Sequence, residues 1–478
     1  MAKVFLTGTN GFIASHLAEL LLARGDEVVG LVRPTSDLRS LEPLFQRYPG
    51  RIQLVTGDLR TGEGLEAGLV DAAYIYHLGA VLMVTSEAEF RATIVDGTRL
   101  LLDAVMKRGI AGVQRFLYVS SQAGAGPSPT AQPIVETDPP RPVSWYGRAK
   151  RDAEGLVRQY GERGLPITIV RPVGVFGERE RDISGGTFPA VKLGLLPRVG
   201  SGNKTVSMVY VGDLVEGIAA AAQSNATRGR TYFLGNPETY TQAAFVGDIA
   251  EAMRSPVRIP IPIPGILLSA VALFAEWLHR FTNARPMVTR DKAREVRQDY
   301  WSASPKAAQR DFGWVAKTTL VDGMRRAIAD WRTRLERARL APATEPTLDR
   351  AVKCYSIAML LGAIAEILAE IGKWYEFTPR WLIFPVIAGY GIAFGTLALV
   401  SVRWSLVLRF LVGAAVFISA ELANHFWLHF WEFAPEPFGR LQVPYGRALV
   451  LSVPIGLMPV VTSAVSAALY RARLRVGA

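Results

Sequence analysis

A tyrosine and a lysine four residues apart, Tyr146 and Lys150, are the pair in this chain with the clearest capacity for chemistry. Residues at this spacing share one face of a helix, so the ammonium group can lie beside the phenol oxygen. A neighbouring cation favours the phenolate and lowers the pKa of a tyrosine from about 10 toward the working range. The pair therefore predicts a proton donor and acceptor suited to interconverting an alcohol and a ketone.

A glycine-rich turn near the N-terminus indicates what this pair would work with. Residues 7–14, Thr-Gly-Thr-Asn-Gly-Phe-Ile-Ala, follow a hydrophobic run and open a helical pattern. Glycines at such a turn let the backbone approach a pyrophosphate, which then rests on the helix N-terminus. A plain glycine-rich turn is the alternative for an isolated match. The strand–turn–helix context favours a dinucleotide, with predicted contacts at Gly8, Asn10, Gly11, Phe12 and Ile13.

The ends of the next two strands bear on which dinucleotide binds. An acidic residue about 20 residues after the turn would mark NAD. This chain instead ends its second strand at Arg33, with Arg39 close by. A guanidinium suits the 2′-phosphate of NADP, so NADP is favoured over NAD, and a solvated strand end is the alternative explanation of Arg33. Asp58 and Leu59, after the third strand, are expected to meet the adenine.

The elements that must position these residues alternate along residues 1–335. Short hydrophobic runs are separated by longer helical patterns such as 12–24 and 97–108, which predicts an α/β fold with a doubly wound parallel sheet. The strands of such a sheet present their carboxyl ends to one crevice. Ser121, at the end of the fifth strand, could bind a substrate oxygen there, and a serine-rich turn is the alternative. Residues 171–177 are expected to line the same crevice. The expected strands are 4–7, 27–32, 52–55, 74–77, 116–119 and 167–170.

In this order the motifs resemble an extended short-chain dehydrogenase/reductase of the epimerase/dehydratase superfamily. The resemblance spans about residues 1–335, with the cofactor half at 1–170 and the substrate-binding elements mainly at 171–335. It implies that Tyr146 is the acid/base, that Lys150 assists it and holds the nicotinamide ribose, and that Ser121 is the hydroxyl partner. Pro172 and Val175 are implied as further cofactor neighbours. The motifs are Thr-Gly-x-x-Gly-x-x-Ala, Asp58-Leu59, Val119-Ser120-Ser121, Tyr146-x-x-x-Lys150 and Arg171-Pro-x-x-Val-Phe-Gly177, with landmarks at 209–214 and 306–314.

One position departs from the family pattern. Ile94 stands where the family usually has asparagine, three residues before the glycine of its Asn-x-x-Gly-Thr helix. Another group must then supply what that amide contributes to a proton relay or to helix geometry. Ile94 is therefore the sequence feature that favours a catalytically inactive cofactor-sensing module over an enzyme.

Within the family, the chain looks more like the dihydroflavonol-reductase and 3β-hydroxysteroid-dehydrogenase-like branch, which acts on hydrophobic alcohols and ketones. Arg33, the apolar proline-rich segment 256–281 and the C-terminal tail carry this likeness. The apolar stretch 266–278 is shorter than the roughly 20 residues of a bilayer crossing, so an interfacial helix or substrate lid is expected, with a core helix as the alternative. A nucleotide-sugar epimerase or dehydratase using NAD is the rival enzyme.

The C-terminal region predicts a separate membrane domain. After a proline-containing linker at 336–352, residues 353–478 hold four apolar segments long enough to span a bilayer. The distribution of lysine and arginine places both ends on the cytoplasmic side, and the N-terminus carries no cleavable signal. We therefore expect an integral membrane protein whose catalytic domain faces the cytoplasm. The expected spans are 354–371, 381–400, 404–426 and 448–470.

The expected partners follow from charge and composition. The chain has 54 Lys+Arg against 42 Asp+Glu, a net charge of +12, with both signs mixed and no aromatic-interleaved basic run. This argues against nucleic acid and favours an anionic bilayer, beside a small hydrophobic substrate. Glu421, His425 and His429 recur every four residues, but two histidines at helical spacing near the interface are a weak signal, and no metal is predicted. The oligomeric state stays open, with a homodimer as the arrangement considered.

Overall fold

The computed structural model describes residues 1–340, except 83, 181, 200–203, 256–258, 264, 266–268, 270–271, 274–275 and 277–288. Contacts divide the chain into two compact units, Met1–Arg334 and Leu335–Ala478. No helix among the described residues is long and apolar enough to cross a membrane. The four expected spans, the linker beyond residue 340 and most of the expected lid lie outside the described residues.

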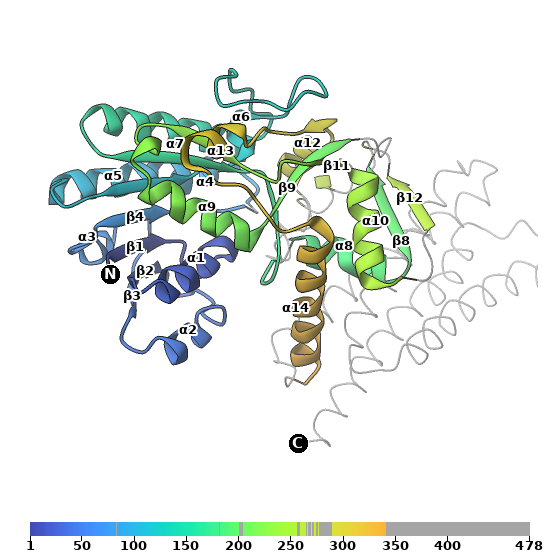
Figure 1. Cartoon of the computed structure of the whole chain (residues 1–478), viewed down its shortest axis with the longest axis horizontal. Coiled ribbons are helices and arrows are strands. Elements are labelled where there is room, and N and C mark those ends of the chain that lie inside the picture. Colours follow the sequence, from blue (N-terminus) through green and yellow to red (C-terminus); the bar gives the residue numbers. More distant parts are fainter. Residues whose placement is uncertain are drawn as a thin grey trace, which may run out of the picture. The chain divides into compact units, whose positions relative to one another are not determined.

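A parallel sheet of seven strands forms the centre of the first unit, in the order β10-β6-β5-β4-β1-β2-β3 (Figure 1). All of its pairings are parallel, so the predicted doubly wound α/β fold is confirmed. The strand order reverses between β1 and β4, where open sheets of this kind bind their ligands. The strands are β1 (Lys3–Thr7), β2 (Glu27–Val32), β3 (Ile52–Thr56), β4 (Tyr74–His77), β5 (Arg115–Val119), β6 (Ile167–Pro172) and β10 (Thr231–Leu234).

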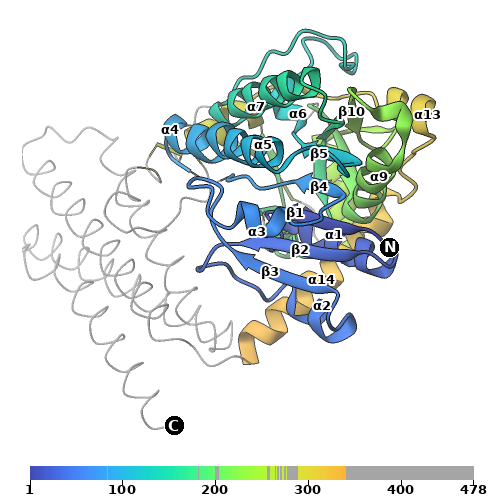
Figure 2. The ribbon, with the colours of Figure 1, turned by 90° about the vertical axis from the view of Figure 1, so that its left-hand side faces the viewer.

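Helices cover both faces of this sheet. On one face, α1 (Phe12–Ala23) contacts α9 (Val211–Gln223), and on the other, α5 (Gly97–Arg108) contacts α3 (Leu65–Leu69) and α7 (Trp145–Glu162), as Figure 2 shows. Because both faces are covered, the strands are almost continuously apolar; every residue of β5 is buried. The core between the sheet and the α5–α7 layer holds fully buried side chains such as Phe5, Ile75 and Phe116, each contributing roughly 1.5–3 kcal/mol.

Smaller elements complete the unit. Strands β7 (Gly174–Phe176), β9 (Thr205–Tyr210), β11 (Thr239–Thr241) and β13 (Tyr300–Trp301) form a second sheet. Among the described residues, the alternating Ile-Pro segment β12 (Ile259–Ile263) pairs only with β8 (Leu195–Val199), as expected for a proline-containing edge strand. The remaining helices are α2 (Glu42–Arg47), α4 (Glu87–Phe90), η1 (Arg91–Asp96), α6 (Gln122–Ala125), α8 (Asp182–Lys192), η2 (Asn225–Thr227), α10 (Gln242–Met253), α12 (Arg290–Val296), α13 (Lys306–Phe312) and α14 (Leu320–Leu340).

The two substrate-domain landmarks of the sequence contact each other. The Asp213 carboxylate accepts hydrogen bonds from the backbone N–H groups of Lys317 (2.9 Å) and Thr318 (2.7 Å). The indole of Trp314 donates to the Asp213 carbonyl at 3.1 Å, and a Cβ added at Gly217 would lie 2.6 Å from the Trp314 ring. These residues therefore hold the segment before α14 against α9, which is a structural role.

Candidate active site

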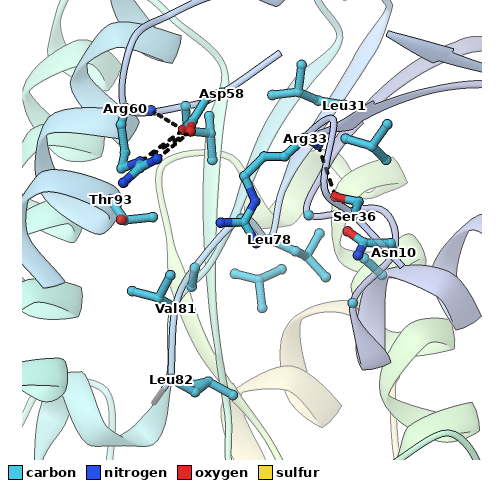
Figure 3. Close-up of a pocket in the computed structure, with 18 of the residues that line it drawn as sticks. Asn10, Leu31, Arg33, Ser36, Asp58, Arg60, Leu78, Val81, Leu82 and Thr93 are labelled. Atoms are coloured by element: carbon cyan, nitrogen blue, oxygen red, sulfur yellow. Dashed lines mark hydrogen bonds and ion pairs between the residues drawn. The ribbon is translucent and has the colours of Figure 1, made fainter. Parts of the chain in front are cut away.

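A cavity of about 530 Å³ lies at the carboxyl ends of the strands, where their order reverses (Figure 3). Five successive strand ends and helix α7 contribute to its wall. Most predicted cofactor and catalytic residues are therefore brought to one place, although they are spread over 140 residues of sequence. Among the lining residues are Gly8, Asn10, Gly11, Phe12, Ile13, Arg33, Asp58, Leu59, Leu78, Val119, Ser120, Tyr146 and Lys150.

The glycine turn after β1 has the geometry of a pyrophosphate cradle. Gly8 has a φ of +70°, and a Cβ there would lie 3.0 Å from the backbone of Gly79, at the end of β4. A Cβ at Gly11 would lie 2.9 Å from the Gly8 carbonyl oxygen. Gly11 also caps α1 without a side chain, so the first N–H groups of the helix are left for a ligand. The turn fits a dinucleotide.

Two arginines lie at the rim of the cavity, at the ends of β2 and β3, and they differ in whether their guanidinium group forms an ion pair. Arg33 is exposed, and Figure 3 shows its side chain extending into the cavity between Asp58 and Asn10. Arg60 instead forms an ion pair with Asp58 at 2.8 Å, which holds the pKa of that carboxyl below its usual range. Arg39 binds Asp37 and does not line the cavity. Arg33 is thus the rim cation whose side chain extends into the cavity.

Tyr146 and Lys150 enter the cavity from the first turns of α7. The ring of Tyr146 packs against Phe90, with 5.9 Å between ring centroids, and its phenol interacts with the Ser121 hydroxyl. Ser121 itself caps α6, accepting a hydrogen bond from the N–H of Ala123 at 3.1 Å, and does not line the cavity. Lys150 is 2% exposed; its Nζ donates to the Val119 carbonyl at 2.8 Å.

The pKa of Tyr146 is raised, whereas the Tyr–Lys spacing suggested that it would be lowered, and Lys150 is not among the groups that shift it. Burial raises the pKa of Tyr146 to about 12, helped by the charge of Glu295 and opposed by the Ser121 hydroxyl. Burial also lowers the pKa of Lys150 to about 7, with the Glu154 carboxylate opposing. The physical reason is that loss of hydration penalises both charged forms, while the ammonium is held by a carbonyl of β5. Tyr146 is therefore a protonated phenol at neutral pH, which suits a proton donor.

Two acidic residues that the sequence did not reveal hold the start of α7. The Asp291 carboxylate accepts hydrogen bonds from the N–H groups of Trp145 (2.6 Å) and Tyr146 (3.2 Å). The Ser144 hydroxyl donates to Glu295 at 2.6 Å while accepting from the N–H of Gly147. Carboxylates at a helix N-terminus are favoured by the helix dipole. Both come from α12, about 145 residues away in sequence, so no local signal could have revealed them.

His77 is a further residue near the site whose role the sequence analysis missed. It is fully buried, with Nδ1 2.7 Å from the Thr7 hydroxyl and Nε2 2.8 Å from the Thr98 hydroxyl. The Thr98 hydroxyl donates its hydrogen to the Ile94 carbonyl, so it must accept a hydrogen bond from the Nε2–H of His77. Nδ1 of His77 is then the acceptor, and the Thr7 hydroxyl donates to it. Burial lowers the pKa of His77 to about 3. A neutral histidine therefore ties the glycine turn to the backbone of Ile94, whose apolar side chain lies in the core.

Residues 171–177, expected at the same crevice, are not among the residues that line this cavity. The predicted cofactor neighbours Pro172 and Val175 lie at the end of β6 and in β7. Arg171 points to the α7 side of the sheet because its guanidinium pairs with Glu154 there, at 2.9 and 2.7 Å. The motif thus fixes α7 against β6, one turn beyond Lys150.

The fold and this cavity define an α/β nucleotide-binding enzyme architecture with a Tyr–Lys pair. Residues 4–235 match the model of the NAD dependent epimerase/dehydratase family. Through this segment the chain is similar to the NAD-dependent epimerase/dehydratase superfamily.

Individual relatives are similar to this chain over about 70% of its length. The 3-beta-hydroxysteroid dehydrogenase of Mycolicibacterium neoaurum is 27% identical over 74% of this chain and 97% of its own length. The ceramide reductase of Caulobacter vibrioides is 29% identical over 69% and 93%, respectively. The solved UDP-glucose 4-epimerase of Thermus thermophilus, in complex with NAD, is 25% identical with a TM-score of 0.55, covering 69% of this chain and 99% of that one. Similar proteins thus include both oxidoreductases and an epimerase.

Proposed function

We propose that this protein is an NAD(P)-dependent oxidoreductase that interconverts an alcohol and a ketone on a small hydrophobic substrate. The observation that carries the proposal is that Tyr146 and Lys150 share their cavity with an apolar segment after β4. Leu78, Val81 and Leu82 line that cavity, and Leu82 is 55% exposed. Exposed apolar side chains beside a proton donor favour a substrate with an apolar body.

The roles of the chain's own groups follow from their positions. Gly8, Gly11 and the start of α1 would hold the pyrophosphate, and Lys150 the nicotinamide ribose. The bound NAD(P) supplies or accepts the hydride. In the reductive direction Tyr146 donates its phenol proton to the substrate oxygen, and Ser121 orients that oxygen through its hydroxyl. In the oxidative direction Tyr146 must first lose its proton, which its raised pKa opposes.

The exposed guanidinium of Arg33 supports NADP as the preferred cofactor. The NAD bound to the similar Thermus thermophilus epimerase supports NAD as the alternative. Comparing turnover with NADPH and with NADH decides between them.

The proposal also places this unit on a bilayer. The expected spans within 353–478 would tether it to the cytoplasmic face, where an apolar substrate could be collected from the membrane. Support for this step comes from the sequence of the C-terminal region and from the two relatives named for steroid and ceramide chemistry.

The test uses the full chain purified in detergent, with NADPH or NADH and a panel of lipophilic ketones. Tyr146→Phe should lower kcat at least about 100-fold, the usual size of a general acid contribution. Tyr160→Phe is the matched control, because Tyr160 lies on the same helix but does not line the cavity. A Tyr146→Phe enzyme that changes only KM would contradict the assigned role.

A nucleotide-sugar epimerase is the second candidate, favoured by the similarity to the solved UDP-glucose 4-epimerase. An epimerase regenerates its NAD⁺ in every cycle, so conversion of a nucleotide sugar without net cofactor turnover would select it. If cofactor binds but neither ketones nor nucleotide sugars react, the cofactor-sensing alternative raised by Ile94 gains.

A further inference from the structure

A second cavity, of about 740 Å³, lies beyond the edge strand β10, away from the glycine turn. Its wall is formed by the loop around residues 135–140, by α7, by the ends of β6 and β10, and by α13. Figure 2 shows α13 beside β10, which it contacts. No residue that the structure describes lines both this cavity and the cofactor cavity. Five cationic side chains line it: Arg158, Arg171, Arg230, Lys306 and Arg310.

The cations outnumber the carboxylates that pair with them. Arg158 and Arg171 share Glu154, and Arg230 and Arg310 share Asp311. Lys306 is exposed and its ammonium group has no partner in the described part of the chain. The two other acidic groups of the wall accept hydrogen bonds from the backbone, and the charge of Glu136 also acts on Arg171 and Arg310. Glu136 accepts from the N–H of Phe233 (2.8 Å) and Asp138 from the N–H of Val135 (2.8 Å).

Arg171 supplies an independent sign of a ligand. It is 3% exposed, and two of its guanidinium nitrogens bind Glu154, but the buried Nη1 has no hydrogen-bond partner among the described residues. A buried polar atom of a charged group without a partner is costly, so such atoms are rarely left unfilled. Because Arg171 lines the cavity, an anion placed there could fill this site.

We propose that the second cavity binds a small phosphate-bearing molecule through Arg171, Lys306 and the neighbouring arginines. The donors come from separate elements, β6, α7, the start of β10 and α13, and so approach from several directions. That arrangement suits the tetrahedral oxygens of a phosphate better than a planar carboxylate, which one guanidinium fork satisfies. The volume is in the range of cavities that hold small molecules.

Glu154 connects this cavity with the catalytic one. Its carboxylate is fully buried and bonded to Arg171 and Arg158 on one side. On the other side it lies near Ser120 and Lys150, which line the cofactor cavity. A ligand that draws Arg171 or Arg158 away from Glu154 would change the charge felt by Lys150. This coupling rests on the proposed function, whereas the binding itself does not.

The binding test measures the affinity of the full chain for inorganic phosphate and for glycerol phosphate by calorimetry in detergent, at constant ionic strength. Lys306→Ala should weaken binding about fivefold, as the loss of one charge near a solvated rim does. Lys317→Ala, which removes an exposed lysine that lines neither cavity, should leave the affinity unchanged. Arg33→Ala locates the site, because it weakens any phosphate bound at the rim of the cofactor cavity instead.

Each outcome has a defined meaning. Loss of affinity in Lys306→Ala but not in Arg33→Ala supports the second site, whether or not the chain reduces ketones. No phosphate binding, or binding sensitive only to Arg33→Ala, overturns it, and tighter binding of malonate overturns the phosphate assignment. If turnover is found, a change in kcat at saturating phosphate that Lys306→Ala removes supports the coupling. An unchanged kcat overturns the coupling alone.

Discussion

At the scale of single residues, burial outweighs charge pairing in deciding the protonation of the site. The Tyr146–Lys150 spacing suggests an ammonium that acidifies a phenol, yet the pKa of Tyr146 is raised and that of Lys150 is lowered. Among the described residues, the Lys150 ammonium has a carbonyl at 2.8 Å and the Tyr118 ring at 4.9 Å to replace its hydration, with Glu154 one turn away. Burial therefore disfavours the charged form of both Tyr146 and Lys150.

This environment predicts how stability depends on pH. The pKa of Lys150 is about 7 in the folded chain and about 10.4 in the unfolded chain, so between these values the unfolded chain binds more protons. The free energy of unfolding therefore rises with pH in this window. Between pH 7 and pH 9, the free energy of unfolding of the wild-type chain should rise by about 2 kcal/mol more than that of Lys150→Met. Chemical denaturation without cofactor measures this difference. Lys317→Met is the surface control. If the difference in unfolding free energy between the wild type and Lys150→Met does not change with pH, the burial argument is refuted.

At the scale of elements, two junctions make the site: the β1–α1 turn against the end of β4, and α12 against the start of α7. In both, a local motif is completed by a segment distant in sequence. Gly8 needs Gly79 opposite it, and the first N–H groups of α7 need the Asp291 carboxylate. The precision of the cavity therefore depends on packing between elements.

The first junction is tested by Gly8→Ala compared with Gly50→Ala. Both glycines have a positive φ, +70° and +75°, but only Gly8 has backbone atoms 3.0 Å from the added Cβ, while Gly50 has none within 4 Å. Each variant should lose about 1–2 kcal/mol of stability from the left-handed backbone. Only Gly8→Ala should also weaken NADPH binding, by at least about tenfold, because the cradle must open. Equal NADPH affinity in the two variants, measured by fluorescence titration, would rule out the cradle.

The second junction is tested by Asp291→Asn. The amide keeps one acceptor for the N–H groups of Trp145 and Tyr146 but loses the charge that favours a helix N-terminus. Stability should fall by about 1 kcal/mol, and kcat should fall more than KM rises, because Tyr146 loses its fixed position. Asp322→Asn, in the exposed first turn of α14, is the control. A lowered thermal midpoint with unchanged kcat would reduce Asp291 to a purely structural group.

At the scale of the whole molecule, the chain combines a dinucleotide-binding unit with a C-terminal region of different composition. The contact division after Arg334 and the change of sequence texture near residue 336 fall close together. A hydrophobic cavity and a bilayer tether are mutually consistent, since apolar substrates concentrate in membranes. A cytosolic nucleotide sugar would gain nothing from such a tether.

The proposed tether makes a prediction for the whole chain. The full-length chain should stay with membranes after carbonate extraction, because the expected apolar segments of spanning length would resist extraction. A chain ending at residue 340 should move to the soluble fraction, provided that it retains NADPH binding as a check of folding. Full-length chain released by carbonate would contradict the expected spans.

The sequence by itself determined the fold class, the six strands expected in the central sheet, the helices α1 and α5, and most of the residues predicted at the cavity. Each rests on a local property: hydrophobic periodicity sets the strands, and glycine at a strand–helix turn sets the cradle. The strands 27–32 and 74–77 and the helix 97–108 coincide with β2, β4 and α5.

Tertiary structure alone decided the protonation of Tyr146 and Lys150, the caps Asp291 and Glu295, the His77 link and the placement of Arg171 in a second cavity. These depend on hydration lost in the folded state and on contacts between residues up to about 150 positions apart. The spacing of residues along the chain predicts neither the lost hydration nor these distant contacts.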